Sequence, residues 1–361
     1  MDFLKLSSYI PQYNEQDTLI IAGPCSAETK EQVVNTATEI AQNKKVHIFR
    51  SGIWKPRTRP GNFEGVGEEG LKWLQEVKKK TQLLTATEVA KAEHIDLALK
   101  YGVDILWIGA RTVSNPFSMQ EIAKHLKDID IPVFIKNPIN PDLSLWQGAI
   151  ERIAQYGNKK VAAIHRGFFP FEETKYRNIP KWELAIELKQ KFHSLPIICD
   201  PSHISGNSDY IAEIAQKALD LNLDGLMIET HNNPTKALSD AKQQITPSQL
   251  NNILEHLVIR QSILDDKKNI LEQYREQIDS IDQQLLELLM QRMKIINQIG
   301  HFKLDNKITI LQLRRWEKII KTRIEFGKEM NLPAAFIKDI LQIIHKESIR
   351  QQNEIMNKPK I

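Results

Sequence analysis

The chain has 361 residues, of which 41% are hydrophobic and 26% charged, which is ordinary for a globular protein and long enough for two domains. Its net charge of +4 is small for this length and does not single out nucleic acid or a membrane as a partner. Two cysteines, Cys25 and Cys199, are too few for a disulfide framework. No apolar run approaches the roughly 20 residues that span a bilayer, and the first residues lack the apolar region of a signal peptide, so we expect a cytoplasmic protein.

Short apolar runs alternate with helical patterns up to about residue 245. Several runs are nearly continuous in Ile, Val and Leu, as expected for parallel strands that are buried on both faces. The runs cover residues 18–26, 46–52, 82–88, 105–110, 132–137, 160–167, 196–203 and 225–230. Eight such β-α units predict a (β/α)8 barrel, and a doubly wound open sheet is the alternative.

The pattern becomes entirely helical after the barrel segment. Thr246-Pro247 marks the start of a helix that we expect to close the barrel. We place the domain boundary so that residues 1–262 form the barrel and residues 263–361 form a small all-α domain. Three helices are expected there.

The first of these helices is predicted to be about 35 residues long, because apolar residues recur every three or four positions from Leu271 to Ile299. The other two cover about 310–329 and 334–355, the last one starting at Pro333. A helix this long cannot bury its apolar face within so small a monomer. We therefore expect a homodimer, or a higher homo-oligomer, formed through the helical domain.

Cationic residues follow several of the predicted strands. In a (β/α)8 barrel the active site lies at the carboxyl ends of the strands, so these residues are expected to converge. A single arginine after a strand is usually a solvated loop residue, but clustered like charges need an anionic ligand. Arginine offers paired donors to carboxylate and phosphate, and lysine offers a compact charge. The residues are Arg50, Lys55, Arg57, Arg111, Lys136 and Arg166.

A second set at the strand ends can bind a metal ion: Cys25, His203, Glu229 and Asp240. One thiolate, one imidazole and two carboxylates favour Mn, Fe, Co or Zn over Mg or Ca. A buried cysteine is more often a small core residue than a ligand. The position of Cys25 at a strand end, after Gly23-Pro24, favours the ligand interpretation.

Six motifs together resemble the 3-deoxy-D-arabino-heptulosonate 7-phosphate (DAHP) synthases of the shorter bacterial type. They are AGPCS (22–26), Arg50 followed by KPRT (55–58), IGAR (108–111), HRG (165–167), DPSH (200–203) and ALSD (237–240). The resemblance implies a metal-dependent condensation of phosphoenolpyruvate, erythrose 4-phosphate and water to DAHP and phosphate. The related octulosonate 8-phosphate synthases, which use arabinose 5-phosphate, resemble KANRS where this chain has KPRT.

The resemblance also implies roles for individual residues. Cys25, His203, Glu229 and Asp240 would bind the metal, with manganese as the first expectation and iron, cobalt or zinc as alternatives. Phosphoenolpyruvate would be bound by Arg50, Lys55, Arg111, Lys136 and Arg166, with Lys55 also transferring a proton. Arg57 and Thr58 would bind erythrose 4-phosphate. The chain departs from many members at KPRTRP, where they have KPRTSP, and at Lys136-Asn137-Pro138, where they have Lys-Arg-Gly.

Cations also interrupt the helical domain, at Arg275, Arg292, Lys303 and Arg315. Arg292 and Lys303 are eleven residues apart, about three helical turns, and therefore share a face that is otherwise apolar. A cation there is costly unless it meets an anionic ligand or an interhelical carboxylate. Arg275 and Arg292 lie roughly 25 Å apart along one helix, so a site containing both would need two chains.

The segment YREQIDSIDQQLLELLMQR (274–292), with Lys303, Arg315 and SIRQQ (348–352), resembles the all-helical chorismate mutases, which form intertwined dimers. The resemblance implies rearrangement of chorismate to prephenate without a cofactor, with Arg292 and Lys303 as catalytic residues. The implied chorismate-binding residues are Arg275 from a second copy, Arg292, Lys303, Arg315, Ser348 and Gln352. Trp316 and Gln312 depart from the family, because many members have Glu and Asp there.

The sequence thus predicts a bifunctional enzyme of aromatic amino-acid biosynthesis. The alternative is a synthase whose helical tail mainly dimerises and senses prephenate or chorismate. A nucleic-acid-binding tail is not expected, since acidic residues interrupt every basic stretch. The expected partners are the small-molecule substrates and further copies of the chain, with no nucleic acid and no membrane.

Overall fold

The computed structural model describes residues 1–361 except 56–60, 62, 172, 261–267 and 358–361, and the side chains of residues 268 and 269 are also left out. The chain divides into two compact units, Met1–Ser262 and Ile263–Ile361, and each is described by itself. None of the helices in the described ranges has the length and the apolar character needed to cross a bilayer.

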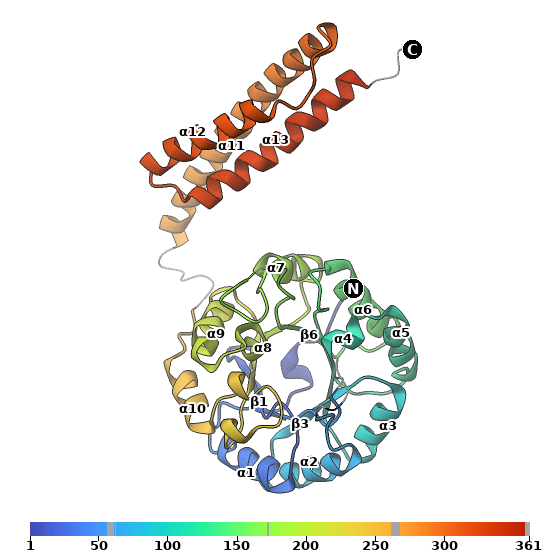
Figure 1. The fold of residues 1–361 in the computed structure, drawn as a ribbon. Coiled ribbons are helices and arrows are strands. Elements are labelled where there is room, and N and C mark those ends of the chain that lie inside the picture. The colour runs from blue at the N-terminus through green and yellow to red at the C-terminus, as the bar shows by residue number, and fades with distance from the viewer. Residues whose placement is uncertain (56–60, 62, 172, 261–267, 358–361) are drawn as a thin grey trace. The chain divides into compact units, whose positions relative to one another are not determined.

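In the described part of the first unit, eight parallel strands pair in sequence order and close into a barrel, with helices around the outside (Figure 1). The first and last strands pair over their whole length, from Leu19 opposite Gly225 to Gly23 opposite Glu229. The closed barrel confirms the predicted fold and excludes the open sheet. The strands are β1 (Leu19–Gly23), β2 (Ile48–Arg50), β3 (Leu84–Val89), β4 (Ile105–Ile108), β5 (Val133–Lys136), β6 (Val161–His165), β7 (Ile197–Cys199) and β8 (Gly225–Glu229).

Alternate residues of each strand pack into different cores, which explains the apolar runs without alternation. Ile20 packs in the layer between strands and helices, whereas Ile21 packs inside the barrel with Trp107. The barrel interior also contains Leu6 and Ile10 from the N-terminal segment. That segment therefore fills the interior at the end where the strands begin, and this was not predicted from the sequence.

Several of the barrel helices have a capping side chain at their N-terminus. Thr246 and Gln249 form a capping box with Pro247 at the first helical position, which confirms the predicted start of the last barrel helix. Asp200 caps a helix of five residues directly after β7 and so brings His203 to the strand end. The helices are α1 (Lys30–Ile40), α2 (Glu68–Thr81), α3 (Ala92–Lys100), α4 (Ala110–Val113), α5 (Pro116–His125), α6 (Leu143–Gln155), α7 (Trp182–Lys191), α8 (Pro201–Ser205), α9 (Ile211–Asp220) and α10 (Pro247–His256), with short 3-10 turns at Leu6–Ser8, Ser208–Tyr210, Pro234–Lys236 and Ala241–Gln243.

The described part of the second unit is helical throughout, as predicted. It consists of α11 (Lys268–Asp305), α12 (Leu313–Glu329) and α13 (Ala334–Met356), and α13 packs against both of the others. Gly327 of α12 allows a close approach, since a β-carbon there would lie 2.2 Å from Ile337 of α13. Pro333 lies at the N-cap of α13 and not within its first turn, where it was expected.

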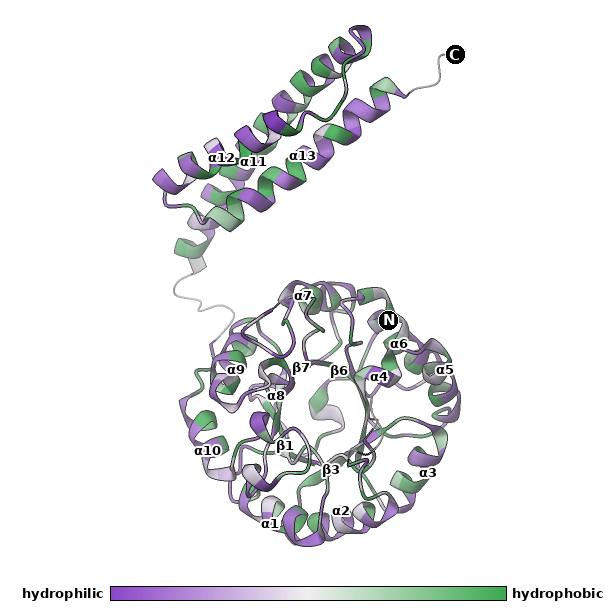
Figure 2. Cartoon of the chain, in the orientation of Figure 1, coloured by the Kyte–Doolittle hydropathy of each residue, from purple (hydrophilic) through white to green (hydrophobic). Residues whose placement is uncertain are grey.

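Much of the apolar face of α11 is exposed in a single chain. Ile278, Ile281, Leu285 and Leu288 are each more than half exposed, and hydrophobic positions recur along the helix (Figure 2). Apolar stripes of this size on one helix normally pack against another surface.

Candidate active sites

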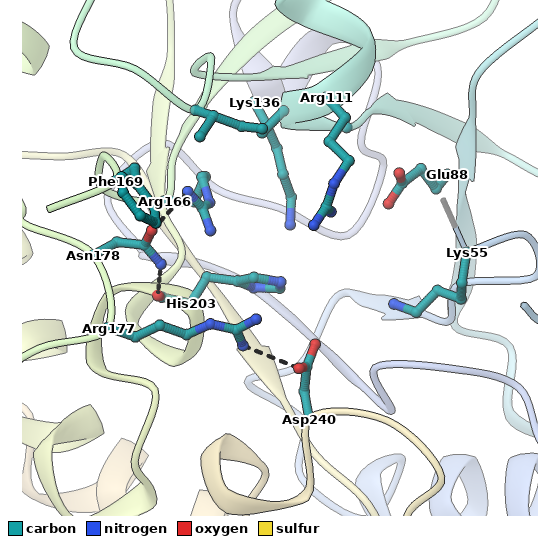
Figure 3. Close-up of a pocket in the computed structure, with 13 residues that line it drawn as sticks. Lys55, Glu88, Arg111, Lys136, Arg166, Phe169, Arg177, Asn178, His203 and Asp240 are labelled. Atoms are coloured by element: carbon teal, nitrogen blue, oxygen red, sulfur yellow. Dashed lines mark hydrogen bonds and ion pairs between the residues drawn. The ribbon is translucent and has the colours of Figure 1, made fainter. Parts of the chain in front are cut away.

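A cavity of about 270 Å³ lies at the carboxyl ends of the barrel strands. Four predicted cations come together there: Lys55 after β2, Arg111 in α4, Lys136 at the end of β5, and Arg166 after β6. Figure 3 shows Arg111, Lys136 and Arg166 pointing toward the same space, opposite His203 and Asp240. The lining also includes Glu88, Phe169, Arg177 and Asn178.

Arg166, on the cationic side of the cavity, is oriented by neutral groups. Arg166 Nη1 donates to Asn178 Oδ1 at 3.0 Å, and its backbone nitrogen donates to Asn137 Oδ1 at 2.7 Å. Burial lowers the pKa of Arg166 to about 10, and the neighbouring charges of Arg177 and Arg111 act in the same direction. A phosphate or carboxylate would relieve this repulsion and accept paired hydrogen bonds.

Lys136 and His203 share one buried carboxylate. Asp200 Oδ2 lies 2.9 Å from Lys136 Nζ and 2.8 Å from His203 Nδ1, while Asp200 Oδ1 accepts from the His203 backbone nitrogen at 3.0 Å. Burial alone would raise the pKa of Asp200, but His203 and Lys136 hold it well below its usual range. The carboxylate leaves His203 Nε2 directed away from Asp200 and available as a ligand.

Three of the four predicted metal ligands form one cluster. Cys25, Glu229 and Asp240 each offer a ligand atom within 4.8 Å of the others. The fourth, His203, has its Nε2 3.8 Å from Glu229 Oε1. The donor set of sulfur, imidazole and two carboxylates fits a first-row transition metal. Burial raises the pKa of the Cys25 thiol to about 12, so a cation is needed to hold it as a thiolate at neutral pH.

The cluster is surrounded by side chains that orient its members. Lys55 Nζ donates to Cys25 Sγ at 3.0 Å and to the Cys25 carbonyl oxygen at 2.8 Å. Arg50 Nη1 lies 2.8 Å from Glu229 Oε1, and Arg177 Nη1 lies 3.0 Å from Asp240 Oδ1. These contacts fix the orientations of Cys25, Glu229 and Asp240.

Arg50 has a different environment from the other predicted phosphoenolpyruvate-binding residues. It is 1% exposed, its guanidinium lies over the Trp107 ring at 4.7 Å, and its Nη2 donates to the Cys25 carbonyl oxygen at 3.3 Å. Its contacts therefore orient Cys25 and Glu229, two of the predicted metal ligands. Arg57 and Thr58 lie outside the described residues.

Several residues of this site were not predicted from the sequence. Arg177 donates to both Asp240 and Gln243, and Gln243 Nε2 donates to Glu229 Oε2 at 2.7 Å. Both belong to irregular connections, where no strand end marks them. Asp200 could have been predicted as a site residue from the sequence, because it directly follows a strand and stands three residues before His203.

In the second unit, four of the six predicted residues are at least partly buried: Arg292 and Lys303 on α11, and Ser348 and Gln352 on α13. Arg292 Nη1 donates to Ser348 Oγ at 2.7 Å, and Lys303 Nζ donates to the Ile310 carbonyl oxygen at 2.6 Å. Ser348, Gln352 and Lys303 are 3%, 5% and 9% exposed, which is unusual for polar residues in so small a unit. Burial lowers the pKa of both Arg292 and Lys303.

The two remaining predicted residues are on the surface of a single chain. Arg315 is exposed at the start of α12, and Arg275 is exposed and lies 2.5 Å from Glu272 of its own helix. Arg275 and Arg292 belong to the same continuous helix, so they are separated by roughly 25 Å. Within one chain, Arg275 therefore does not lie near Arg292.

Comparison with protein families divides the chain in the same way. Residues 6–265 match the model of the DAHP synthetase I family, and residues 274–353 match that of chorismate mutase type II.

Individual proteins resemble the barrel unit. A phospho-2-dehydro-3-deoxyheptonate aldolase of Thermotoga maritima is 33% identical over 63% of this chain, and the match spans 64% of that relative's length. A 2-dehydro-3-deoxyphosphooctonate aldolase of Stenotrophomonas maltophilia is 27% identical over 68% of this chain and 91% of its own length.

Two solved structures from Thermotoga maritima are similar as well. The crystal structure of phospho-2-dehydro-3-deoxyheptonate aldolase (DAHP synthase) superposes with a TM-score of 0.60 at 30% identity, covering 67% of this chain and 68% of the other. A truncated form of 3-deoxy-D-arabino-heptulosonate 7-phosphate synthase gives 0.57 at 28% identity, covering 66% and 85%. Since the family match covers more than half of the chain, this protein belongs to the DAHP synthetase I family and carries a chorismate mutase type II region after the barrel.

Proposed function

We propose that the barrel unit condenses phosphoenolpyruvate with erythrose 4-phosphate and water to give DAHP and phosphate. The observation that carries this proposal is a cavity with Lys55, Arg111, Lys136 and Arg166 on its walls beside the Cys25 cluster. Two phosphorylated substrates need such a cationic lining, because their like charges otherwise repel at close range.

The chain's own residues have distinct tasks in this reaction. Arg111, Lys136 and Arg166 bind the phosphate and carboxylate of phosphoenolpyruvate, and Arg57 with Thr58 binds the aldose phosphate. This arrangement aligns C3 of phosphoenolpyruvate with the aldehyde carbon, which it attacks, after which water adds at C2 and phosphate leaves. Lys55 is placed to transfer a proton, since its ammonium reaches the edge of the cavity next to Cys25.

Cys25, His203, Glu229 and Asp240 would hold a divalent metal ion, with manganese the first candidate and iron, cobalt or zinc the alternatives. A metal bound there would act as a Lewis acid toward the aldehyde oxygen. Arg50, Arg177 and Gln243 keep the carboxylates in position, and Asp200 orients the imidazole.

For the helical unit we propose rearrangement of chorismate to prephenate, without a cofactor. The supporting observation is that Arg292 donates a hydrogen bond to a hydroxyl oxygen, and Lys303 donates one to a backbone carbonyl oxygen. Within the described residues neither side chain forms an ion pair with a carboxylate, so the two charges suit an anionic ligand. They would bind its carboxylates and stabilise negative charge on the ether oxygen, with Arg315, Ser348 and Gln352 completing the pocket.

We further propose that the helical unit acts as a homodimer or higher homo-oligomer. The exposed apolar face of α11 would be covered by a second copy, which would supply Arg275.

The choice of aldose phosphate tests the barrel assignment, because relatives of both the heptonate and the octonate type match this chain. Purified protein with added Mn²⁺ is supplied with phosphoenolpyruvate and either erythrose 4-phosphate or arabinose 5-phosphate. We expect phosphate release with the first aldose and less than about one-hundredth of that kcat/KM with the second. Preference for arabinose 5-phosphate would contradict the assignment.

A further inference from the structure

A stripe of polar side chains on α13 contains buried atoms that lack hydrogen-bond partners. His345, Ser348 and Gln352 stand at intervals of three and four residues, so they share one helix face. Within the described residues, His345 Nε2 and Gln352 Oε1 are buried and have no hydrogen-bond partner. Buried polar atoms are nearly always hydrogen-bonded, so a ligand is expected to meet these two.

The stripe faces positive charge. Ser348 Oγ accepts from Arg292, and the charges of both Arg292 and Lys303 act on His345. Burial lowers the pKa of His345, and these two cations on α11 lower it further. The imidazole is therefore neutral at pH 7, and it is a neutral hydrogen-bonding group near two cations.

The orientation of the imidazole is set by a neighbouring helix. Trp316 of α12 stacks on His345 with ring centroids 3.8 Å apart and planes 9° from parallel. A stacked ring cannot tilt freely, so the direction of Nε2 is defined before a ligand enters. Trp316 directly follows Arg315, one of the predicted chorismate-binding residues.

We propose that His345 is a substrate-contacting residue of the helical unit, whose Nε2 hydrogen-bonds an uncharged oxygen of the ligand, and that Trp316 positions its ring. Different side chains then bind the charged and the neutral parts of the ligand. Arg292 and Lys303 meet the carboxylates and the ether oxygen, whereas the neutral imidazole meets the hydroxyl. This inference rests on the proposed rearrangement of chorismate.

The test compares variants of the full-length protein in chorismate turnover. His345→Leu removes the ring nitrogen and keeps the bulk, and His345→Gln returns a donor close to the position of Nε2. His301→Leu is the matched control, because His301 is an exposed histidine on α11. We expect kcat/KM to fall about tenfold or more in His345→Leu, to recover to within about threefold of wild type in His345→Gln, and to remain unchanged in the control.

The positioning role of Trp316 is tested by Trp316→Leu, alone and combined with His345→Leu. If Trp316 acts through His345, the double variant is no slower than His345→Leu alone. If the two substitutions were independent packing defects, their fold-losses in kcat/KM would multiply. Multiplicative effects would overturn the positioning role.

Other outcomes separate the inference from the function on which it rests. A His345→Leu variant within twofold of wild type, or equal losses in His345→Leu and His345→Gln, would overturn the contact while leaving the rearrangement intact. A wild-type protein that does not convert chorismate would overturn both.

Discussion

At the scale of single residues, Asp200 connects two parts of the barrel site through one oxygen atom. Its Oδ2 lies within 3 Å of both Lys136 Nζ and His203 Nδ1, and its Oδ1 caps α8. One side chain therefore contacts a predicted phosphoenolpyruvate-binding lysine, a predicted metal ligand and the helix that carries that ligand.

Replacing Asp200 by Asn separates these roles. The Asn side chain retains the cap but loses the negative charge beside the imidazole, which weakens His203 as a ligand. The melting temperature should fall, because buried Lys136 loses its carboxylate partner. We expect the affinity of the folded protein for Mn²⁺ to fall about 10- to 100-fold. Calorimetric titration of the metal-free protein measures this, and an unchanged affinity would rule out the orienting role.

Arg292 provides the residue-scale test in the helical unit. Arg292→Ala removes a cation from a partly buried position, and without it the developing charge on the ligand loses a hydrogen-bond donor. We expect chorismate turnover to fall at least about a thousandfold while DAHP synthesis stays measurable. Substantial mutase activity in this variant would show that the site lies elsewhere.

At the scale of elements, β6 is joined to the helix layer by a buried histidine. His165 is fully buried among aromatic rings, with centroids 5.1 Å from Trp182 of α7 and 6.2 Å from Trp146 of α6. Burial lowers the pKa of His165 to about 3, with the charge of Arg166 acting in the same direction.

This pKa predicts how stability depends on pH. In the unfolded chain the imidazole takes up a proton below about pH 6.5, whereas in the folded barrel it stays neutral to about pH 3. Acid therefore favours the unfolded state in this window, by about 1.4 kcal/mol between pH 7.5 and 5.5. Urea unfolding at the two pH values measures the free energy of unfolding. Between pH 7.5 and 5.5 this free energy should fall by this much more in wild type than in His165→Leu. Equal drops would contradict the shifted pKa.

Elements with a local sequence pattern were predictable, and contacts between distant irregular segments were not. Each apolar run overlaps one strand, and Thr246 caps the start of α10 as expected, because strand burial and helix capping depend on neighbouring residues. Lys136 and Glu229 each end a strand, and both were predicted to lie at the site because strand ends meet on one rim. Arg177 had no such signal, since only the folded connection between β6 and α7 places it 3.0 Å from Asp240. The N-terminal segment inside the barrel also depends on tertiary packing alone.

At the scale of the whole molecule, a barrel of the DAHP synthetase I family is joined to a unit matching chorismate mutase type II. With the proposed activities, this fusion would place a binding site for a late product on an early enzyme. We expect prephenate to lower the synthase activity roughly fivefold or more through the helical unit. The comparison is between wild type and Arg292→Ala in the full chain, at saturating prephenate. Equal responses of the two proteins would show that inhibition does not pass through the Arg292 pocket.

The central claim is that one chain carries two chemistries with different requirements. The most direct measurement assays one preparation for phosphate release from phosphoenolpyruvate with erythrose 4-phosphate and, separately, for loss of chorismate, each with and without a chelator. The proposed metal site at Cys25, His203, Glu229 and Asp240 predicts that the chelator abolishes the first activity and that Mn²⁺ restores it. The proposed cofactor-free rearrangement predicts that the second activity is unchanged. Condensation that persists after complete metal removal, or chorismate turnover lost with the metal, would contradict this account.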